Sequence, residues 1–313
     1  MEIYTEITDL RQRFPKIAVV LGTFDGVHLG HRQIISRAVE LAKSINGKSV
    51  VFTFSNHPLS VVAPDRCPLQ IGSQESKAAL IEDIGVDVLL TIPFTPEFAK
   101  LSPEDFLTLL HDTLDPKYVV VGPNYSFGYK SSGTPEILKS SGKKYGFEVE
   151  VLDAFQHGNN IISSTAIRQL ISEGHVACAA KLLGRLFIIE GPVIQGAQRG
   201  RELGYPTANL AITKGQVIPA DGVYATRVFI DGKWYNSIAN VGTNPTFQES
   251  DRRLEVYIFL FHGNLYDKII KVGFVRRIRN EQKFNSPDEL IAQIKRDVNE
   301  AEQYLCNNNC SVV

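Results

Sequence analysis

The feature that most constrains the fold of this chain is a change in its hydrophobic pattern near residue 184. Before that point, short apolar runs alternate with amphipathic stretches that have the 3.6-residue period of a helix. After it, long helical patterns stop, and apolar and polar residues alternate with the period of two that is typical of half-buried strands. We therefore predict two domains, an α/β domain over residues 1–184 and an all-β domain over residues 185–313.

The first part predicts a parallel sheet with helices on both faces, in a Rossmann-like arrangement. Apolar runs give the candidate strands, which are residues 17–23, 48–54, 86–92, 118–122 and 147–152. Amphipathic stretches give the candidate helices, which are residues 31–45, 74–84, 103–114 and 134–144. The third helix has clear start signals, with Ser102 as N-cap, Pro103 at the first helical position and Asp105 three residues after the cap. In such folds the binding sites collect at the carboxyl ends of the strands.

The second part predicts a small closed β-barrel with a terminal helix. Its clearest strands are residues 222–230, 233–242 and 254–261. In the last of these, Glu255, Tyr257, Phe259 and Phe261 share one face, and the apolar residues between them share the other. The final helix is expected to start at Ser286, because SPDE supplies an N-cap, a proline at the first helical position and a capping-box glutamate.

Composition excludes several classes of protein. The net charge of −1 disfavours a general nucleic-acid binder or a protein that binds anionic membranes, since both usually carry a basic excess. The N-terminus has neither a basic region nor an apolar core of a signal peptide, and no apolar run approaches the ~20 residues of a membrane helix. The scattered cysteines are expected to be reduced thiols in a cytoplasmic protein; they are Cys67, Cys178, Cys306 and Cys310.

One short stretch, 22-GTFDGVHLGH-31, predicts a phosphate site where a strand passes into a helix. Its glycines permit a tight turn and close approach of the backbone to a ligand. His28 and His31 are three residues apart and can face the same bound group. The helix start adds unpaired N–H groups and a partial positive charge, so an anion is the expected ligand.

Two further stretches complete the predicted N-terminal site. In 162-ISSTAIRQLI-171, Ser163 or Ser164 is expected to cap a helix, and Ser164 and Arg168 then lie on one face as a second phosphate clamp. In the loop 121-VGPNYSFGYKSSGT-134, Asn124 offers a hydrogen bond, and Tyr125 or Phe127 offers a ring for stacking. Packing of these aromatic rings in the core is an equally good interpretation.

The β part has its own candidate site in 196-GAQRGRELGYPTANL-210. Its glycines allow a flap over phosphates, and Thr207 and Asn209 lie two residues apart on one side of an extended strand. A hydroxyl and an amide oxygen suit Mg²⁺, which takes few protein ligands and completes its shell with phosphate oxygens and water. Glu255 is the carboxylate that we expect to deprotonate an alcohol nucleophile.

Together these motifs resemble the bacterial bifunctional riboflavin kinase/FMN adenylyltransferase family, the FAD synthetases. His28-Leu29-Gly30-His31 is similar to the HxGH signature of nucleotidyltransferases, and TFSNHP, VGPNYSFG and ISSTAIR resemble other motifs of the adenylyltransferase module. GRELGYPTANL, NVGTNPTF, LEVYIFLF and RNEQKF resemble the riboflavin kinase module. The sequence departs from the usual family pattern at Ser55-Asn56, in the GPNYSFG loop and at Asn244.

The resemblance implies two reactions. Riboflavin and ATP give FMN and ADP in the C-terminal domain, and FMN and ATP give FAD and pyrophosphate in the N-terminal domain, with Mg²⁺, or Mn²⁺ in its place, as the metal. It implies His28, His31, Arg168 and Glu255 as catalytic residues and Thr207 and Asn209 as metal ligands. The residues expected to bind nucleotide or flavin are Gly22, Phe24, Asp25, Gly26, Gly30, Asn124, Ser164, Thr165, Gly196, Gly204 and Arg279.

Other functions remain open at this point. The chain is compatible with a nucleotidyltransferase for another phosphorylated acceptor, whose β part would set specificity; Thr207, Asn209 and Glu255 argue against this. A class I aminoacyl-tRNA synthetase also has an HxGH helix, but the neutral charge and the lack of an anticodon-binding segment argue against it. A flavin-sensing protein with decayed sites is disfavoured by the intact histidines, Arg168 and Glu255.

Overall fold

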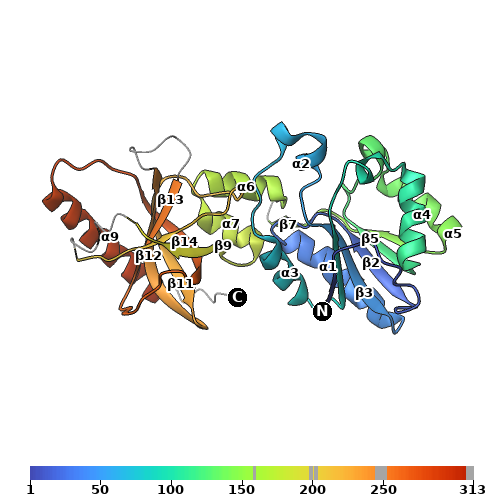
Figure 1. Cartoon of the computed structure of the whole chain (residues 1–313), viewed down its shortest axis with the longest axis horizontal. Coiled ribbons are helices and arrows are strands. Elements are labelled where there is room, and N and C mark those ends of the chain that lie inside the picture. Colours follow the sequence, from blue (N-terminus) through green and yellow to red (C-terminus); the bar gives the residue numbers. More distant parts are fainter. Residues whose placement is uncertain (158–159, 197–199, 201–203, 244–251, 308–313) are drawn as a thin grey trace. The chain divides into compact units, whose positions relative to one another are not determined.

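The computed structural model describes residues 1–157, 160–196, 200, 204–243 and 252–307. The chain divides into two compact units, Met1–Pro68 with Ser73–Ser163, and Leu69–Gly72 with Ser164–Val313 (Figure 1). This division lies ahead of the predicted domain boundary at residue 184, and it groups residues 164–184 with the barrel. That residues 1–184 and 185–313 are two domains with separate activities therefore remains a prediction. Asn244 and Cys310 lie outside the described residues.

The first unit is built on the predicted parallel sheet. Its strand order is β1-β4-β3-β2-β5-β6, and all neighbouring strands are parallel. The strands are β1 (Glu2–Tyr4), β2 (Ile17–Leu21), β3 (Lys48–Phe54), β4 (Val88–Ile92), β5 (Tyr118–Val121) and β6 (Glu148–Val151). β1 has no counterpart among the predicted strands. A short antiparallel pair, β7 (Gln156–His157) and β8 (Asn160–Ile161), follows the sheet.

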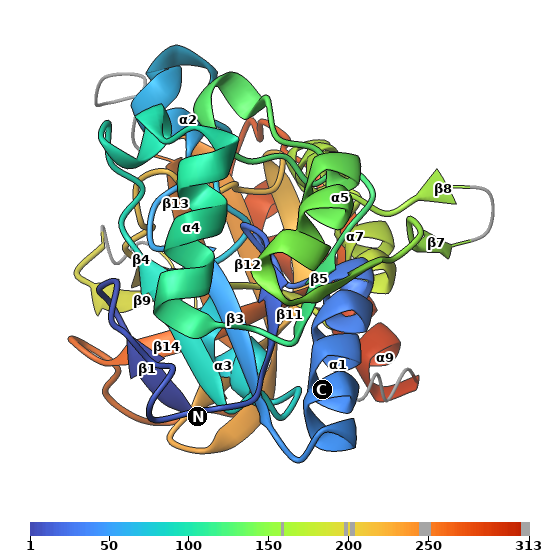
Figure 2. The same ribbon diagram turned by 90° about the vertical axis from the view of Figure 1, so that its right-hand side faces the viewer.

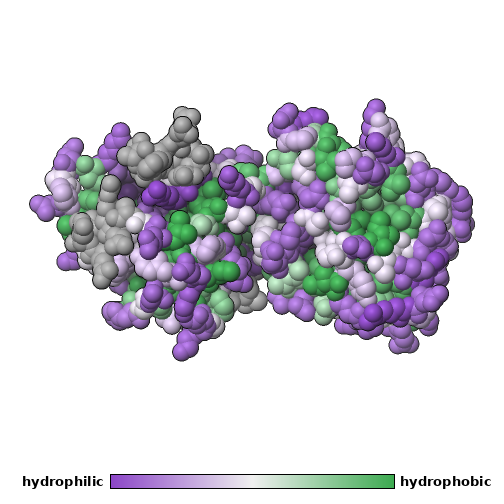
Figure 3. Space-filling model, in the orientation of Figure 1, coloured by the Kyte–Doolittle hydropathy of each residue, from purple (hydrophilic) through white to green (hydrophobic). Residues whose placement is uncertain are grey.

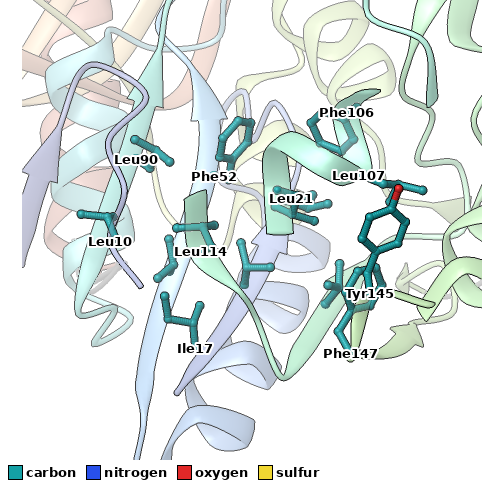
Figure 4. Close-up of a cluster of buried hydrophobic side chains, with 14 of the residues drawn as sticks. Leu10, Ile17, Leu21, Phe52, Leu90, Phe106, Leu107, Leu114, Tyr145 and Phe147 are labelled. Atoms are coloured by element: carbon teal, nitrogen blue, oxygen red, sulfur yellow. The ribbon is translucent and has the colours of Figure 1, made fainter. Parts of the chain in front are cut away.

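Helices cover both faces of this sheet, as the sequence predicts. The helices of the unit are α1 (Leu29–Ser44), α2 (Leu59–Val62), α3 (Gln74–Glu82), α4 (Pro103–Leu114) and α5 (Pro135–Tyr145). Buried residues of α4 and α5 pack with one set of strand residues, and those of α1 and α3 pack with the alternate set. Figure 2 looks onto the α4–α5 side, and Figure 4 shows part of that core, including Leu107, Leu114 and Tyr145. Because both faces are covered, every residue of β2 is buried.

The predicted start of α4 is confirmed. The hydroxyl of Ser102 accepts the N–H of Asp105, and the Asp105 carboxylate accepts the N–H of Ser102, which makes a capping box. Pro103 occupies the first turn, where its missing N–H costs nothing. Local sequence signals therefore fix this helix end before any tertiary contact is considered.

The strand order places a topological switch point between β2 and β5. From β2 the chain builds β3 and β4 on one side, and then returns to place β5 on the other side of β2. Ligands in open parallel sheets bind outside the carboxyl ends of the strands at such a point. The two loops that flank it are residues 22–28 and residues 122–134, which are the two loops that the sequence singles out.

The second unit contains the predicted closed barrel, with strand order β10-β13-β12-β11-β14-β9. Its strands are β9 (Phe187–Ile194), β10 (Ala208–Leu210), β11 (Gly222–Ile230), β12 (Lys233–Thr243), β13 (Arg252–Ile258) and β14 (Ile269–Asn280). Helices of this unit whose bounds are described are α6 (Ser164–Ser172), α7 (Val176–Leu183) and α9 (Pro287–Asn307). Buried residues of β11, β14 and α9 form one cluster, against which Ala180 of α7 packs.

Two details of the barrel differ from the sequence analysis. The strand expected over residues 254–261 ends at Ile258, because Phe259 and Leu260 form a turn in which Leu260 has a positive φ of 54°. The alternation predicted around Glu255 holds only up to that point, with Leu254, Val256 and Ile258 buried. At the start of α9, the Ser286 hydroxyl accepts the N–H of Glu289, but the Glu289 carboxylate accepts the N–H of Asn285 instead of that of Ser286.

No helix in the described part of the chain is both long and apolar enough to cross a membrane. Some large apolar side chains are exposed, and the Leu260 side chain is 91% exposed. On the face drawn in Figure 3, hydrophilic residues border the apolar areas of each unit.

Candidate active sites

The loop after β2 shapes the start of α1 around two histidines. His28 is the N-cap residue, and its Nδ1 accepts the N–H of His31 at 3.2 Å. Because Nδ1 is an acceptor, the neutral His28 ring carries its proton on Nε2. The His31 ring stacks on the His28 ring with centroids 3.6 Å apart, and Phe24 meets His31 edge-on at 5.3 Å. The two imidazoles therefore lie together at a helix N-terminus, as the sequence predicts.

The tight packing of this loop explains its glycines. A Cβ on Gly30 would lie 3.2 Å from the Cβ of Phe155 and 3.3 Å from the His28 ring. A Cβ on Gly22 would lie 2.7 Å from the Phe24 ring. Gly26 has a φ of 77°, which glycine adopts without steric cost. Asp25 is half-buried beside it.

In the loop after β5, the three residues predicted as ligand contacts have different environments. Phe127 is buried and packs 5.3 Å from Phe106 in the core, so the core interpretation is confirmed for this ring. Tyr125 is half-buried and stacks on Phe127 with centroids 5.8 Å apart. Asn124 is exposed in the turn ahead of it. Of these residues, Asn124 and one face of Tyr125 remain as candidates for ligand contact.

An aromatic cluster that the sequence analysis did not identify lies at the carboxyl ends of β3 and β4. Phe54 packs edge-on against Phe94 at 5.0 Å and against Phe98 at 5.3 Å. Asn56 holds these two loops together: its Oδ1 accepts the N–H of Phe94 at 2.7 Å, and its Nδ2 donates to the Phe94 carbonyl at 3.1 Å. The unusual Asn56 is thus a structural tie between the loops that carry the cluster. The only signal in the sequence was the density of Phe and Pro in 92-IPFTPEF-98.

Ser164, Thr165 and Arg168 lie on α6. The helix begins at Ser164, so Ser163 takes the position directly before it. Ser164 and Arg168 are both half-buried and one turn apart, and Thr165 is exposed. These residues belong to the second compact unit, whereas His28 and His31 belong to the first. Their predicted meeting around one triphosphate remains a prediction.

In the barrel, strand register brings the predicted kinase residues together. Asn209 of β10 lies directly across from Glu255 of β13, so their side chains share one face of the sheet. On the other side of Glu255 the register partner is Asn240 of β12, which the sequence analysis did not single out. Thr207 precedes β10 by one residue and lies two residues before Asn209. Asn209 is buried, Thr207 and Glu255 are half-buried, and Asn240 is exposed.

Gly196 and Gly200, which precede Thr207, lie close to this part of the barrel. A Cβ on Gly196 would lie 2.2 Å from the Asn209 amide nitrogen, so only glycine permits this approach. A Cβ on Gly200 would lie 2.4 Å from the Tyr205 carbonyl oxygen. Gly204 is exposed, with a φ of 83°. The rest of the expected flap, residues 197–199 and 201–203, lies outside the described residues.

The oxygen atoms at this place fit a small divalent cation. The Oδ1 atom of Asn209 is buried and has no hydrogen-bond partner within the described part of the chain. A buried amide oxygen without a partner costs free energy, and a cation would remove that cost. Thr207 adds a second neutral oxygen, and the two suit a metal that keeps other oxygens from ATP and water.

Arg279 is engaged in the protein itself. Its Nη2 lies 2.8 Å from Asp297 Oδ2, and its Nε donates to the same carboxylate at 2.9 Å. Asp297 is buried on α9 and also accepts from Gln293 at 2.7 Å. The pair therefore ties the end of β14 to α9. The predicted contact of Arg279 with a ligand remains a prediction.

Comparison with known proteins separates the same two regions. A family model described as FAD synthetase matches residues 10–166, and one described as riboflavin kinase matches residues 183–305. The protein named bifunctional riboflavin kinase/FMN adenylyltransferase in Bacillus subtilis is 36% identical to this chain over 95% of both chains. The protein of that name in Escherichia coli is 37% identical to it over 92% of both chains. A protein of the same name from Buchnera aphidicola is 36% identical over 97% of this chain and 99% of its own.

A solved structure from Streptococcus pneumoniae is also similar, with a TM-score of 0.87 and 34% identity over 96% of this chain and 99% of its own. Its title names a macrolide-efflux protein. The similarity supports the architecture described above. The family models and the relatives named above carry the assignment of function.

Proposed function

The chain belongs to the family of bifunctional riboflavin kinases/FMN adenylyltransferases, and from this premise we propose how its residues divide the two reactions. The chain phosphorylates riboflavin to FMN and adenylylates FMN to FAD, with ATP as the second substrate of each step. Adenylyl transfer is assigned to the N-terminal region and phosphorylation to the barrel. We place both reactions in the cytoplasm, consistent with Cys67, Cys178 and Cys306, which form no disulfide among the described residues.

Adenylyl transfer is supported by the histidine pair at the start of α1. A phosphate oxygen of FMN attacks the α-phosphorus of ATP, and the bond from that phosphorus to the bridging oxygen breaks to release pyrophosphate. His28 donates from Nε2, and His31 and the N–H groups of the helix start share the charge that builds on the leaving group. The nucleophile is already ionised at neutral pH, so this step needs no general base.

The flavin of this step is assigned to the aromatic cluster. Phe54, Phe94 and Phe98 offer flat apolar surface at the carboxyl ends of β3 and β4, next to the switch point. Asn124, which is exposed in the loop after β5, is proposed to hydrogen-bond the edge of the ring. Ser164, Thr165 and Arg168 of α6 remain predicted contacts of a triphosphate.

Phosphorylation is supported by the row of polar side chains across β10, β13 and β12. Glu255 takes the proton of the ribityl hydroxyl of riboflavin while the oxygen of that hydroxyl attacks the γ-phosphorus of ATP, and ADP leaves. Thr207 and Asn209 would hold Mg²⁺, or Mn²⁺ in its place, and such an ion would offset negative charge on the phosphates. The single observation that carries the proposal is the register that sets Asn209 directly across from Glu255.

Labelled ATP tests this assignment directly. Purified protein is incubated with riboflavin and Mg²⁺, and the flavins are separated by chromatography. Label on the γ-phosphate is expected in FMN and FAD, and label on the α-phosphate in FAD alone. Absence of the γ-label from FMN, or of the α-label from FAD, would refute the corresponding half of the proposal.

A further inference from the structure

A buried lysine beside the first candidate site has no part in the mechanism above. Lys77 lies on α3 with a side chain that is 8% exposed, and its Nζ donates to the Phe54 carbonyl at 2.7 Å. Burial lowers the pKa of Lys77 to about 8, and the negative charge of Asp25 opposes that shift. A lysine ammonium is rarely buried, because removing it from water is costly unless the protein supplies partners.

The lysine lies where the end of β3 is fastened to the loop that carries the histidines. The Phe52 carbonyl accepts the N–H of Gly22 at 3.3 Å, and the Thr53 hydroxyl donates to the Thr23 carbonyl at 3.1 Å. Phe52 and Thr53 of β3 therefore bond directly to the loop. The carbonyl of the next residue, Phe54, bonds to Lys77, whose charge is attracted to that of Asp25.

This loop needs such fastening because its backbone is strained. Phe24 has a φ of 51° and Val27 a φ of 37°, and both are residues with a Cβ that disfavours the left-handed region. Each such residue costs on the order of 1 kcal/mol or more and persists only where its surroundings hold it. The loop ends at His28, whose Nδ1 caps α1. A relaxed loop would therefore move the imidazoles.

We propose that Lys77 is a positioning residue for adenylyl transfer: its ammonium binds the Phe54 carbonyl at the end of β3, next to the residues that bond to the strained loop, and so holds that loop in the conformation that presents His28 and His31. The same side chain binds the carbonyl of Phe54, whose ring is part of the aromatic cluster assigned to the flavin. Lys77 thus links the residues assigned to the triphosphate with those assigned to the acceptor. This inference rests on the proposed assignment of adenylyl transfer to the first unit.

The charged form of the lysine holds this arrangement best, since an ammonium is a stronger donor to the Phe54 carbonyl than an amine and only the ammonium is attracted to the negative charge of Asp25. The negative charge of Asp25 favours the ammonium form of Lys77. FAD formation should therefore decline as the pH rises through about 8, and the pH profile reports on this lysine in a way that a purely structural role would not. Riboflavin phosphorylation in the same sample is the internal control, because its residues lie in the other unit.

The experiment compares Lys77→Met, Lys77→Arg and, as a matched control, Lys43→Met on the exposed end of α1. Each full-length variant is assayed from pH 6.5 to 9.5 for conversion of FMN to FAD and of riboflavin to FMN. We expect Lys77→Met to lose ~10²-fold in FAD formation at pH 7, as a misplaced site typically does, and to lose the alkaline decline. Lys77→Arg should retain activity and move the decline to higher pH. Lys43→Met should match the wild type.

Several results would overturn the inference. One is a wild-type rate of FAD formation in Lys77→Met, and another is an alkaline decline that persists unchanged in Lys77→Arg. The arginine variant keeps the charge, so its profile decides the question even where the methionine variant is poorly folded. If the wild-type protein itself makes FMN but no FAD, the proposed function fails instead, and that result is read before any variant is compared.

Discussion

The ion pair between Arg279 and Asp297 should contribute more to the stability of the barrel than any exposed pair. The Asp297 side chain is 5% exposed and that of Arg279 is 16% exposed, and two nitrogens of the guanidinium reach the carboxylate. Removing one partner of a buried pair costs about 3–5 kcal/mol, because the other charge stays buried without compensation. Arg279 keeps some contact with water, so we expect Asp297→Ala to cost about 3 kcal/mol. For a unit of this size that corresponds to a fall in Tm of roughly 6–12 °C.

The single tryptophan makes this measurable in the full-length protein. Trp234 lies on β12, so its fluorescence follows unfolding of the barrel unit alone. The matched control is Glu300→Ala, which removes an exposed ion pair with Arg276 between the same two elements, β14 and α9. That control should change the free energy of unfolding by less than about 1 kcal/mol. If Asp297→Ala destabilises the barrel no more than Glu300→Ala does, the reasoning from burial is wrong.

Three further predictions concern the metal site, the buried lysine and the domain boundary. Asn209→Leu should raise the KM for metal-bound ATP in riboflavin phosphorylation by about tenfold or more, while FAD formation from supplied FMN stays unchanged; equal effects on both reactions would contradict the site. The pKa of Lys77 is lowered from 10.5 to about 8, so the folded state loses this proton first and its stability rises between those pH values by about 3 kcal/mol. Urea unfolding followed by circular dichroism should show that rise in the wild type relative to Lys77→Met, and parallel pH curves would refute it. Residues 185–313 alone should fold and phosphorylate riboflavin, with lower thermal stability than a fragment that also contains α6 and α7; a folded but inactive fragment would show that the kinase site needs residues from outside it.

Much of the fold follows from local sequence. The alternation of apolar runs and helices predicts the parallel sheet, and the Ser102-Pro103 start and the period-two pattern around Glu255 each match the observed elements. These signals are readable because each depends on residues close in the chain. The strand order depends on contacts between distant residues. The short strand β1 does so too, because it forms by pairing with β4.

The candidate sites follow the same division. The histidine pair and the Thr207–Asn209 pair are each contained in one stretch, so the sequence identifies them. Asn240 enters only through the register of β12 with β13, and the aromatic cluster only through loops that follow different strands. Lys77 reads in sequence as an ordinary lysine on an amphipathic helix; only its burial against Phe54 distinguishes it.

One chain is proposed to carry two separable sites, and a crossed assay of two variants tests that separation. The double variant His28→Ala/His31→Ala and the variant Glu255→Gln are each fed riboflavin or FMN with ATP and Mg²⁺, and the flavins are separated by chromatography. The histidine variant should accumulate FMN and lose at least ~10²–10³-fold in FAD formation. Glu255→Gln should lose ~10²–10⁴-fold in FMN formation, yet convert supplied FMN to FAD at the wild-type rate. If both conversions fall together in either folded variant, the two sites are not separable and the account is contradicted.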